Sequence, residues 1–416
     1  MASNDNSYYL APTLASVEQD LREKKVDEQQ PVFIDGLATS RLGIDPLKNT
    51  RHAPMVYHER YSCPNWPTKH TFPMAKFHQT AVSLLNDSDD WDMMPLVLSQ
   101  KDFYRPLPVK AFPKSFISPP ICPKFLEDFI SGSLSAEACR LIGFREQTSR
   151  SELIERTILE VAGTVLTAQL AMKFGIASNL AGGTHHAEAS VGKGYTIIND
   201  LAVSARLMTL KEEEEIDDSG GILSEFYRGE DGSSVDRVLV VDCDVHQGDG
   251  TATFSQPPPA STDATSRANN LYNKLFTLDL HAANNYPFAK ETCTYDVGLP
   301  DDCDDVSYLS ALSTSLEKAL NEVEPQLVLY NAGVDVYEAD KLGRLALSWE
   351  GMRERDLHVI QTCVDRGIPV AAVVGGGYDD DVELLGRRHA LVHRVCAQVW
   401  RERQMWSRPN GGMPAA

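Results

Sequence analysis

From residue 149 onward, the chain alternates short apolar runs with longer segments of mixed polarity. The apolar runs are IASNLAGG, RVLVVDCDVH, KLFTLDLH, QLVLYNAGVD and IPVAAVVGGGY. Runs that are apolar throughout, without alternating polar residues, predict strands that are buried on both faces. Helices are predicted between them, around residues 304–323 and from Trp349 to Arg366. Strands and helices in this alternation predict a parallel sheet that is covered by helices.

The segment before the first of these strands predicts a long helix. Ser149 and Glu152 fit a capping box at its start, and Gly175 lies where a helix would end. Upstream, residues 50–125 are rich in proline and aromatic side chains. That composition predicts irregular loops between short helices.

The remaining segments predict extensions and insertions around one large domain. We expect a polar extension over residues 1–48, the main domain over 49–405 and a short tail over 406–416. The acidic run at 211–221 and the proline-rich run at 255–270 are predicted to be surface insertions.

Polar signatures follow the predicted strands. They read THH, DCDVHQGDG, DLH, VD and GGGY, in chain order. Because ligands bind beyond the carboxyl ends of parallel strands, we expect these residues to meet at one edge of the sheet.

The segment DCDVH predicts a metal site. In extended backbone, residues two apart share a face, so Asp242, Asp244 and His246 point to the same side. Asp244 and His246 are predicted to bind one ion together with Asp335, which follows a different strand. Three protein ligands leave a coordination position open, as in catalytic zinc sites. The alternative is an acidic turn whose carboxylates accept hydrogen bonds from backbone amides.

Two adjacent histidines, His185 and His186, follow Gly182 and Gly183 at another strand end. A histidine that acts as a base needs a partner that fixes its tautomer. Aspartates 242 and 249 remain once the metal ligands are assigned, which suggests two His–Asp pairs. The alternative is that both histidines are ordinary buried or surface residues.

The GGGY segment ends in Tyr378, whose phenol could donate a hydrogen bond to an oxyanion. The alternative is a glycine turn with a tyrosine packed beside it. A metal, a histidine base and a phenol donor together favour attack of metal-activated water on an amide carbonyl. No GxSxG or nucleophilic cysteine motif favours a covalent route, and neither GxGxxG after a strand nor GxxxxGK[ST] indicates a nucleotide.

The net charge and the cysteine pattern indicate which binding partners and which cellular compartment to expect. The net charge of −20 argues against direct nucleic-acid binding, and it favours either a cationic substrate or simple solubility. The eight cysteines are scattered singly, which is typical of a reducing compartment. No apolar run approaches the roughly 20 residues of a membrane span, and no signal or transit pattern is evident. We therefore expect an intracellular protein, in the cytoplasm of a bacterium or in the nucleus or cytoplasm of a eukaryote.

Several motifs, in this order, resemble those of the zinc-dependent histone deacetylase family. They are HTFPMAKF, GGTHHAEASVGKGY, VDCDVHQGDGTATF, LYNAGVDVYEADKLGRLALS and GGGY. The likeness extends from about residue 50 to about residue 400, and NAGVDVYEADKLGRL is most similar to the class IV branch and its bacterial relatives. The resemblance implies a single three-layer α/β/α domain around a parallel sheet of about eight strands, as in arginases.

The resemblance also implies the chemistry. Asp244, His246 and Asp335 match the zinc ligands, and Tyr378 matches the residue that polarises the acyl carbonyl. The implied reaction removes acetyl or longer acyl groups from lysine side chains of histones or other proteins, by attack of zinc-bound water. Such an enzyme would act in chromatin regulation and in protein complexes.

Each histidine matches a family residue with its own aspartate. His186 matches the general base and acid, paired with Asp249. His185 matches the second histidine of the family, which is paired with an aspartate, here Asp242. This histidine helps to stabilise charge in the site.

Gly194, Tyr195 and Tyr286 match the walls of the acyl-lysine tunnel. A structural potassium ion is also implied, and its ligands would come from Asp242, Asp244, His246, Asp279 and Leu280. The chain departs from the common family pattern at Gln247, where many members have histidine, and at Tyr195, which replaces phenylalanine. These departures leave the substrate preference open.

Other functions remain to be weighed against this one. An arginase-type enzyme needs a second metal, but Gly248 and Tyr337 stand where its extra carboxylates would be. We therefore expect one zinc per chain, with ferrous iron as the alternative. Acylated polyamines are an alternative substrate, and a non-catalytic acyl-lysine-binding scaffold is an alternative function.

Overall fold

The structure, a computed structural model, describes residues 39–407 apart from positions 42, 44, 89–92, 211–234 and 258–270. Its main sheet has seven strands in the order β2-β4-β9-β8-β5-β6-β7. Every neighbouring pair in this sheet is parallel. The predicted α/β fold with a central parallel sheet is confirmed, with seven strands in the described residues where about eight were expected.

The strands of the main sheet are β2 (Met55–Val56), β4 (Ile176–Asn179), β5 (Val238–Asp242), β6 (Leu275–Ala282), β7 (Tyr295–Leu299), β8 (Leu327–Asn331) and β9 (Val370–Val373). A separate antiparallel pair joins β1 (Thr39–Arg41) to β3 (Arg105–Pro106). The longer helices are α2 (Lys76–Asn86), α4 (Pro123–Ile130), α6 (Ser151–Phe174), α7 (Asp200–Met208), α10 (Asp305–Val323), α11 (Trp349–Asp365) and α12 (Val382–Glu402). Shorter helices are α3 (Lys114–Ile117), α5 (Ala136–Ile142) and α8 (Asp249–Ser255).

The five apolar runs of the sequence form the five central strands, β4, β9, β8, β5 and β6. Nearly every residue in them is buried, as expected for strands with helices on both faces. The two edge strands were not predicted. One of them, β2, has only two residues, and β7 alternates half-buried and exposed positions along most of its length.

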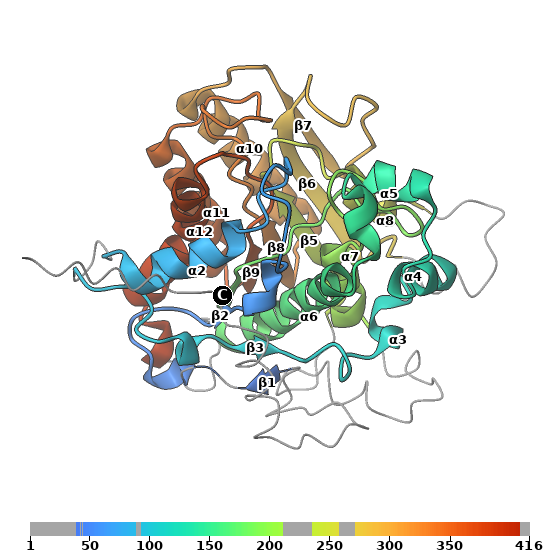
Figure 1. Cartoon of the computed structure of the whole chain (residues 1–416). Helices are drawn as coiled ribbons and strands as arrows, with labels where there is room; N and C mark the ends of the chain where they lie inside the picture. The colour runs from blue at the N-terminus through green and yellow to red at the C-terminus, as the bar shows by residue number, and fades with distance from the viewer. Residues whose placement is uncertain are drawn as a thin grey trace, which may run out of the picture.

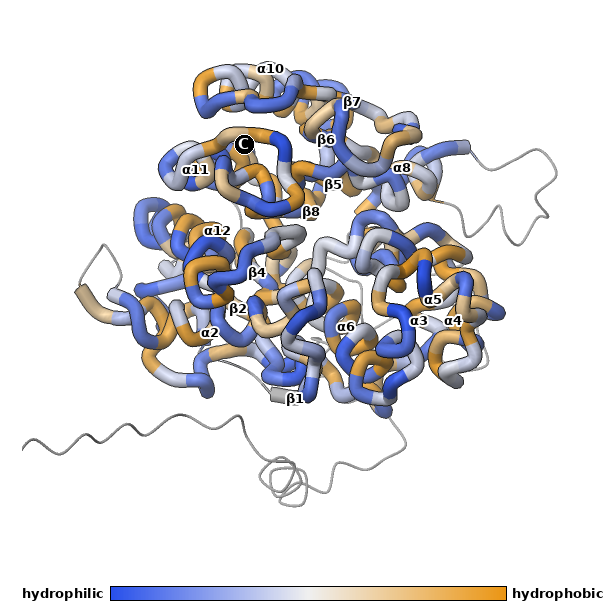
Figure 2. The backbone as a smooth tube through the Cα atoms, turned by 45° about the horizontal axis from the view of Figure 1, so that its top comes forward, coloured by the Kyte–Doolittle hydropathy of each residue, from blue (hydrophilic) through white to orange (hydrophobic). Residues whose placement is uncertain are grey.

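Two helical layers enclose the sheet (Figure 1). Helices α10, α11 and α12 pack beside one another on one side, where α10 contacts β6 and β7 and α12 contacts β4. On the other side α6 packs against β4, β8 and β9, and α7 packs against α6. Figure 2 shows the same layers after rotation, with α3, α4 and α5 on the α6 side of the molecule.

Helix α6 is buried on almost all sides because it lies between the sheet and α7. It ends at Gly175, whose φ of 88° is in the left-handed region, as predicted for a terminating glycine. Its predicted start is wrong. The helix begins at Ser151 without a side-chain cap, and Ser149 instead belongs to a preceding 3-10 turn, where its hydroxyl donates to the carbonyl of Glu146.

The expected extensions and insertions lie largely outside the described residues. Within 1–48, the structure describes β1 and a 3-10 turn at Pro46–Lys48. Within 406–416, it describes only the last two residues of the turn Met405–Ser407. Segment 211–221 is outside, and of 255–270 only the first three residues are described. None of the helices in the described ranges is long and apolar enough to cross a bilayer.

A buried arginine joins the two strand ends that carry the predicted metal ligands. Arg355 of α11 donates to the carbonyls of Cys243, at 3.1 Å, and Gly333, at 2.6 Å. Its Nε also donates to the carboxylate of Asp356, at 2.9 Å, and both side chains are fully buried. The guanidinium thus fixes the segments after β5 and β8 to each other.

Replacing Arg355 by methionine should destabilise the fold by about 3–5 kcal/mol, because Asp356 would be left as a buried charge without its partner. Urea unfolding, followed by circular dichroism, measures this loss. Arg353→Met is the matched control, since Arg353 pairs with Glu350 and Glu354 near the surface and its loss should cost less than about 1 kcal/mol. Equal midpoints for the two variants would contradict this role for Arg355.

Candidate active site

The carboxyl ends of β4, β5, β8 and β9 lie at one edge of the sheet, because these strands are parallel. The chain passes from β4 to β5 and leaves a space that β8 and β9 fill later. The segments that follow these four strands carry the predicted site residues. Side chains that are up to about 200 residues apart in sequence therefore meet at this edge, as expected for a sheet whose strand order changes direction.

Asp244, His246 and Asp335 form a buried cluster in which one ligand atom from each residue lies within 4.8 Å of the others. The Nδ1 atom of His246 is 3.1 Å from Oδ1 of Asp244 and 3.2 Å from Oδ2 of Asp335. Backbone amides hold both carboxylates in place. Val245 donates to Asp335 at 2.9 Å, and Gly376 donates to Asp244 at 2.7 Å.

The cluster fits a divalent cation. Zinc ligands at about 2.0–2.2 Å in tetrahedral geometry are roughly 3.3 Å from one another, close to the separations seen here. Burial, together with the charge of Asp244, raises the pKa of Asp335 above its ordinary value. Two carboxylates that repel each other in a buried position are stabilised by a cation between them. Among the described residues, this is the one such cluster of histidine, cysteine and acidic side chains.

The two adjacent histidines each contact a separate aspartate. Nδ1 of His185 is 2.8 Å from Asp242, and Nδ1 of His186 is 2.7 Å from Asp249. The two imidazole rings are 4.1 Å apart, and both are buried. These are the two pairings that the sequence suggests. Asn331, at the end of β8, donates to the second oxygen of Asp242 at 2.9 Å and so fixes this carboxylate.

The surroundings raise the pKa of His185 and lower the pKa of His186. Burial opposes a charge on His185, but the carboxylates of Asp242 and Asp244 outweigh burial and raise its pKa to about 10. Burial and the neighbouring His185 lower the pKa of His186 to about 3, and Asp249 opposes them only in part. His185 is therefore suited to carry a positive charge, whereas His186 is uncharged and keeps one ring nitrogen without a proton.

Tyr378 lies beside the cluster, with its ring centre 6.3 Å from that of His246. Burial and the carboxylates of Asp335 and Asp244 raise the pKa of Tyr378 well above its ordinary value, so its hydroxyl keeps its proton. The carboxylate of Asp340 accepts a hydrogen bond from the backbone amide of Tyr378 at 2.7 Å. This contact ties the GGGY segment to the loop after β8.

The predicted tunnel residues lie around His186. The ring of Tyr286 is 5.0 Å from that of His186, and Tyr195 stacks on Phe144 at 5.6 Å. A Cβ atom on Gly194 would lie 2.5 Å from the His186 ring and 3.2 Å from the Tyr286 ring. Glycine at this position thus keeps open the space between the rings of His186 and Tyr286.

The residues that would bind potassium lie on neighbouring strands, because Asp242 of β5 pairs in register with Asp279 of β6. The carboxylate of Asp279 accepts hydrogen bonds from the amide of Gly248, at 2.7 Å, and from the ring of His281, at 2.8 Å.

Sequence reasoning gave no role to Lys76, although it lies in the quoted motif HTFPMAKF. Its side chain is buried, and it donates to the carbonyl of Gly375 at 3.0 Å. The ammonium lies 5.7 Å from the ring centre of Tyr378. Burial lowers the pKa of Lys76 to about 8. The buried face of α2 also holds Thr80 and Ser83, so the sequence gives no clear local signal for Lys76.

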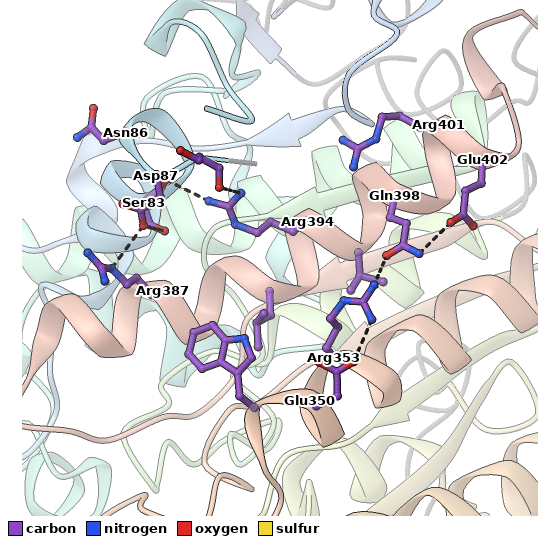
Figure 3. Close-up of a pocket in the computed structure, with 14 residues that line it drawn as sticks. Ser83, Asn86, Asp87, Glu350, Arg353, Arg387, Arg394, Gln398, Arg401 and Glu402 are labelled. Carbon is purple, nitrogen blue, oxygen red and sulfur yellow. Dashed lines mark hydrogen bonds and ion pairs between the residues drawn. The ribbon is translucent and has the colours of Figure 1, made fainter. Parts of the chain in front are cut away.

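A small cavity of about 30 Å³ touches His185, His186, Gly194, Tyr195 and Tyr378. A larger groove of about 940 Å³ lies elsewhere, along α12 between the end of α2 and the start of α11. Figure 3 shows that charged side chains line this groove and that several of them pair with one another, as Arg353 does with Glu350. It contains none of the predicted site residues, so the smaller cavity is the candidate active site.

The three-layer fold, with a carboxylate and imidazole cluster at the carboxyl edge of its sheet, is that of α/β proteins of the arginase and deacetylase type. A family model described as the histone deacetylase domain matches residues 124–217 and 226–392. The chain belongs to the histone deacetylase family.

Individual proteins are also similar to this chain. An uncharacterized protein of the cyanobacterium Picosynechococcus is 37% identical over 348 residues, which are 83% of this chain and 99% of that protein. Histone deacetylase 2 of Arabidopsis thaliana is 29% identical over 56% of this chain and 54% of its own length. The fold is similar to that of an HDAC homolog solved in complex with SAHA, with a TM-score of 0.53, 18% identity and 84% of each chain covered.

Proposed function

We propose that the protein is a metal-dependent amidohydrolase that removes acyl groups from lysine side chains of proteins. One observation carries this proposal. Asp244, from a buried cluster of two carboxylates and an imidazole, lines one small cavity together with the uncharged His186 and the protonated Tyr378. This set of groups provides for hydrolysis of an amide without a covalent intermediate.

Asp244, His246 and Asp335 would hold one zinc ion, with ferrous iron as the alternative. Such an ion supplies Lewis-acid chemistry, since it lowers the pKa of water and polarises a carbonyl group. A structural potassium ion is proposed as well, with ligands from the backbone of Asp242, Asp244 and His246 and from Asp279 and Leu280; the register of Asp242 with Asp279 supports this.

The protein side chains move the protons. His186 accepts a proton from the attacking water, and Asp249 holds its ring in the tautomer that presents Nε2 to the cavity. Tyr378 donates a hydrogen bond to the oxyanion that forms from the carbonyl oxygen of the acyl group. His186 then gives its proton to the departing amine, while the positive charge of His185 stabilises the negative charge in the site. Gly194, Tyr195 and Tyr286 would enclose the alkyl chain of the substrate.

Tyr378→Phe should lower kcat by about 10²–10³-fold with little change in KM, because the oxyanion loses a hydrogen-bond donor while the cavity keeps its shape. Steady-state kinetics on an acetyl-lysine peptide measure this effect. Tyr295→Phe is the matched control, since Tyr295 lies on edge strand β7, outside the site, and its hydroxyl donates to Glu322 of α10. A Tyr378→Phe variant as fast as the control would remove Tyr378 from the mechanism.

A substrate panel tests the proposed function itself. Peptides with acetyl-lysine or longer acyl-lysines are compared with acetylated polyamines, and the metal content is measured on the same protein sample. The proposal expects turnover of an acyl-lysine peptide and one metal ion per chain. Turnover of polyamines alone would favour the small-molecule alternative, which the net charge of −20 also suits. A metal-loaded protein that binds acyl-lysine peptides without turnover would favour a scaffold.

A further inference from the structure

The aspartate that partners His186 is held from its other side by a lysine. Oδ1 of Asp249 faces His186, and Oδ2 lies 2.8 Å from the Nζ atom of Lys193. Lys193 also forms an ion pair with Glu188, which is closer to the surface. The four residues make a continuous chain of polar contacts from the candidate base to the edge of the site.

The backbone of Lys193 begins the turn that carries the tunnel wall. The amide of Thr196 donates to the carbonyl of Lys193 at 2.9 Å, and the two residues between them, Gly194 and Tyr195, have φ values of 58° and 61°. Two central residues with positive φ are typical of a tight type I′ turn. One residue therefore anchors the Asp249 carboxylate through its side chain and the Gly194–Tyr195 wall through its backbone.

Burial makes this contact strong and directional. The Lys193 side chain is 15% exposed and that of Asp249 is 3% exposed, so water screens their attraction little. Hydrogen bonds from His186 and Lys193 lower the pKa of Asp249, although burial by itself would raise it. With a donor on each oxygen, the carboxylate cannot rotate without losing one contact.

We propose that Lys193 is a positioning residue for the general base, which acts by fixing the Asp249 carboxylate from the side opposite His186. The inference rests on the proposed function, because it assigns His186 as the base. Lys193 touches neither the proposed metal ligands nor the cavity, so its effect on turnover would pass through Asp249.

Replacing Lys193 by methionine should lower kcat by about tenfold or more and change KM by less than about threefold, as for other residues that orient a catalytic group. Lys193→Gln is a second neutral variant, so the result does not depend on one variant folding. Lys193→Arg should recover most of the rate, since it restores a cation. Lys124→Met is the matched control, because Lys124 pairs with Asp128 on exposed α4.

A double-mutant cycle separates positioning from a general structural role. In an Asp249→Asn background, Lys193→Met should reduce kcat by less than about twofold, because the carboxylate through which it acts is gone. An equal loss in both backgrounds, or neutral variants as fast as the wild type, would overturn the inference.

A spectroscopic measurement tests the role of Lys193 independently of turnover. In protein labelled with ¹⁵N-histidine and free of metal, the proton on Nδ1 of His186 should give a low-field resonance that His186→Ala removes. Lys193→Met should shift or broaden it, and an unchanged resonance would overturn the inference. If the wild type turns over no acylated substrate, yet Lys193→Met still shifts this resonance, the proposed function is overturned and the positioning role remains.

Discussion

Asp335→Ala should abolish stable metal binding and reduce turnover to background. Asp335 is fully buried and would provide one of three ligand atoms, and the remaining pair, Asp244 and His246, lies on a single segment after β5. Loss of a direct ligand should weaken metal affinity well beyond the roughly 10–100-fold expected for residues that only support ligands. Metal content after dialysis, together with a competition titration against a chelating dye, measures the change.

Thermal unfolding gives a second measure of the same effect. Added zinc should raise the Tm of the wild type, because an ion that binds only the folded state stabilises it, but it should not raise the Tm of Asp335→Ala. Without metal, the variant should be no less stable than the wild type, since it lacks a carboxylate whose pKa is raised by burial and by the charge of Asp244. Asp301→Ala, which removes an exposed carboxylate paired with Arg344, is the control and should bind metal normally. Full metal occupancy in Asp335→Ala would place the ion elsewhere.

His186→Ala should lower kcat by about 10²–10⁴-fold, the range expected when a general base and acid is removed. The metal cluster should remain loaded, because His186 contacts Asp249 and not the ligand carboxylates. Rates on an acyl-lysine peptide, normalised to metal content, measure the effect. If the wild type and His186→Ala show equal, near-zero rates, the protein acts as a scaffold and not as an enzyme.

The central part of the fold was readable from the sequence because its strands are apolar throughout. β5 and β8 are buried at every position, and their charged or amide side chains, Asp242 and Asn331, stand only at the carboxyl ends, so the apolar pattern before them is clear. The edge strands lack this signal. In β7 the residues before Leu299 alternate between half-buried and exposed, and β2 is too short to show any period. The start of α6 was misplaced because the Ser149 hydroxyl bonds within the preceding turn.

The residues of the site that could be predicted stand at strand ends in chemically distinctive groups, such as His185 beside His186. The residues that could not be predicted act through contacts across the fold. Asp340 accepts a hydrogen bond from the backbone amide of Tyr378, 38 residues away, and Asn331 donates a hydrogen bond to Asp242, 89 residues away. A short local motif indicates which groups can do chemistry. It does not indicate which distant side chain fixes their orientation, because that depends on how the strands are ordered in the sheet.

Gly376 limits how the cluster of Asp244 and Asp335 can be studied by mutagenesis. A Cβ atom on it would lie 2.1 Å from Oδ2 of Asp335 and 2.6 Å from Oδ2 of Asp244. Alanine scanning normally trims a side chain, but at this position it adds a methyl group to the space that an ion would occupy. A mutant library that omits glycines would therefore miss positions such as Gly376, where adding a single methyl group fills space needed for the ion.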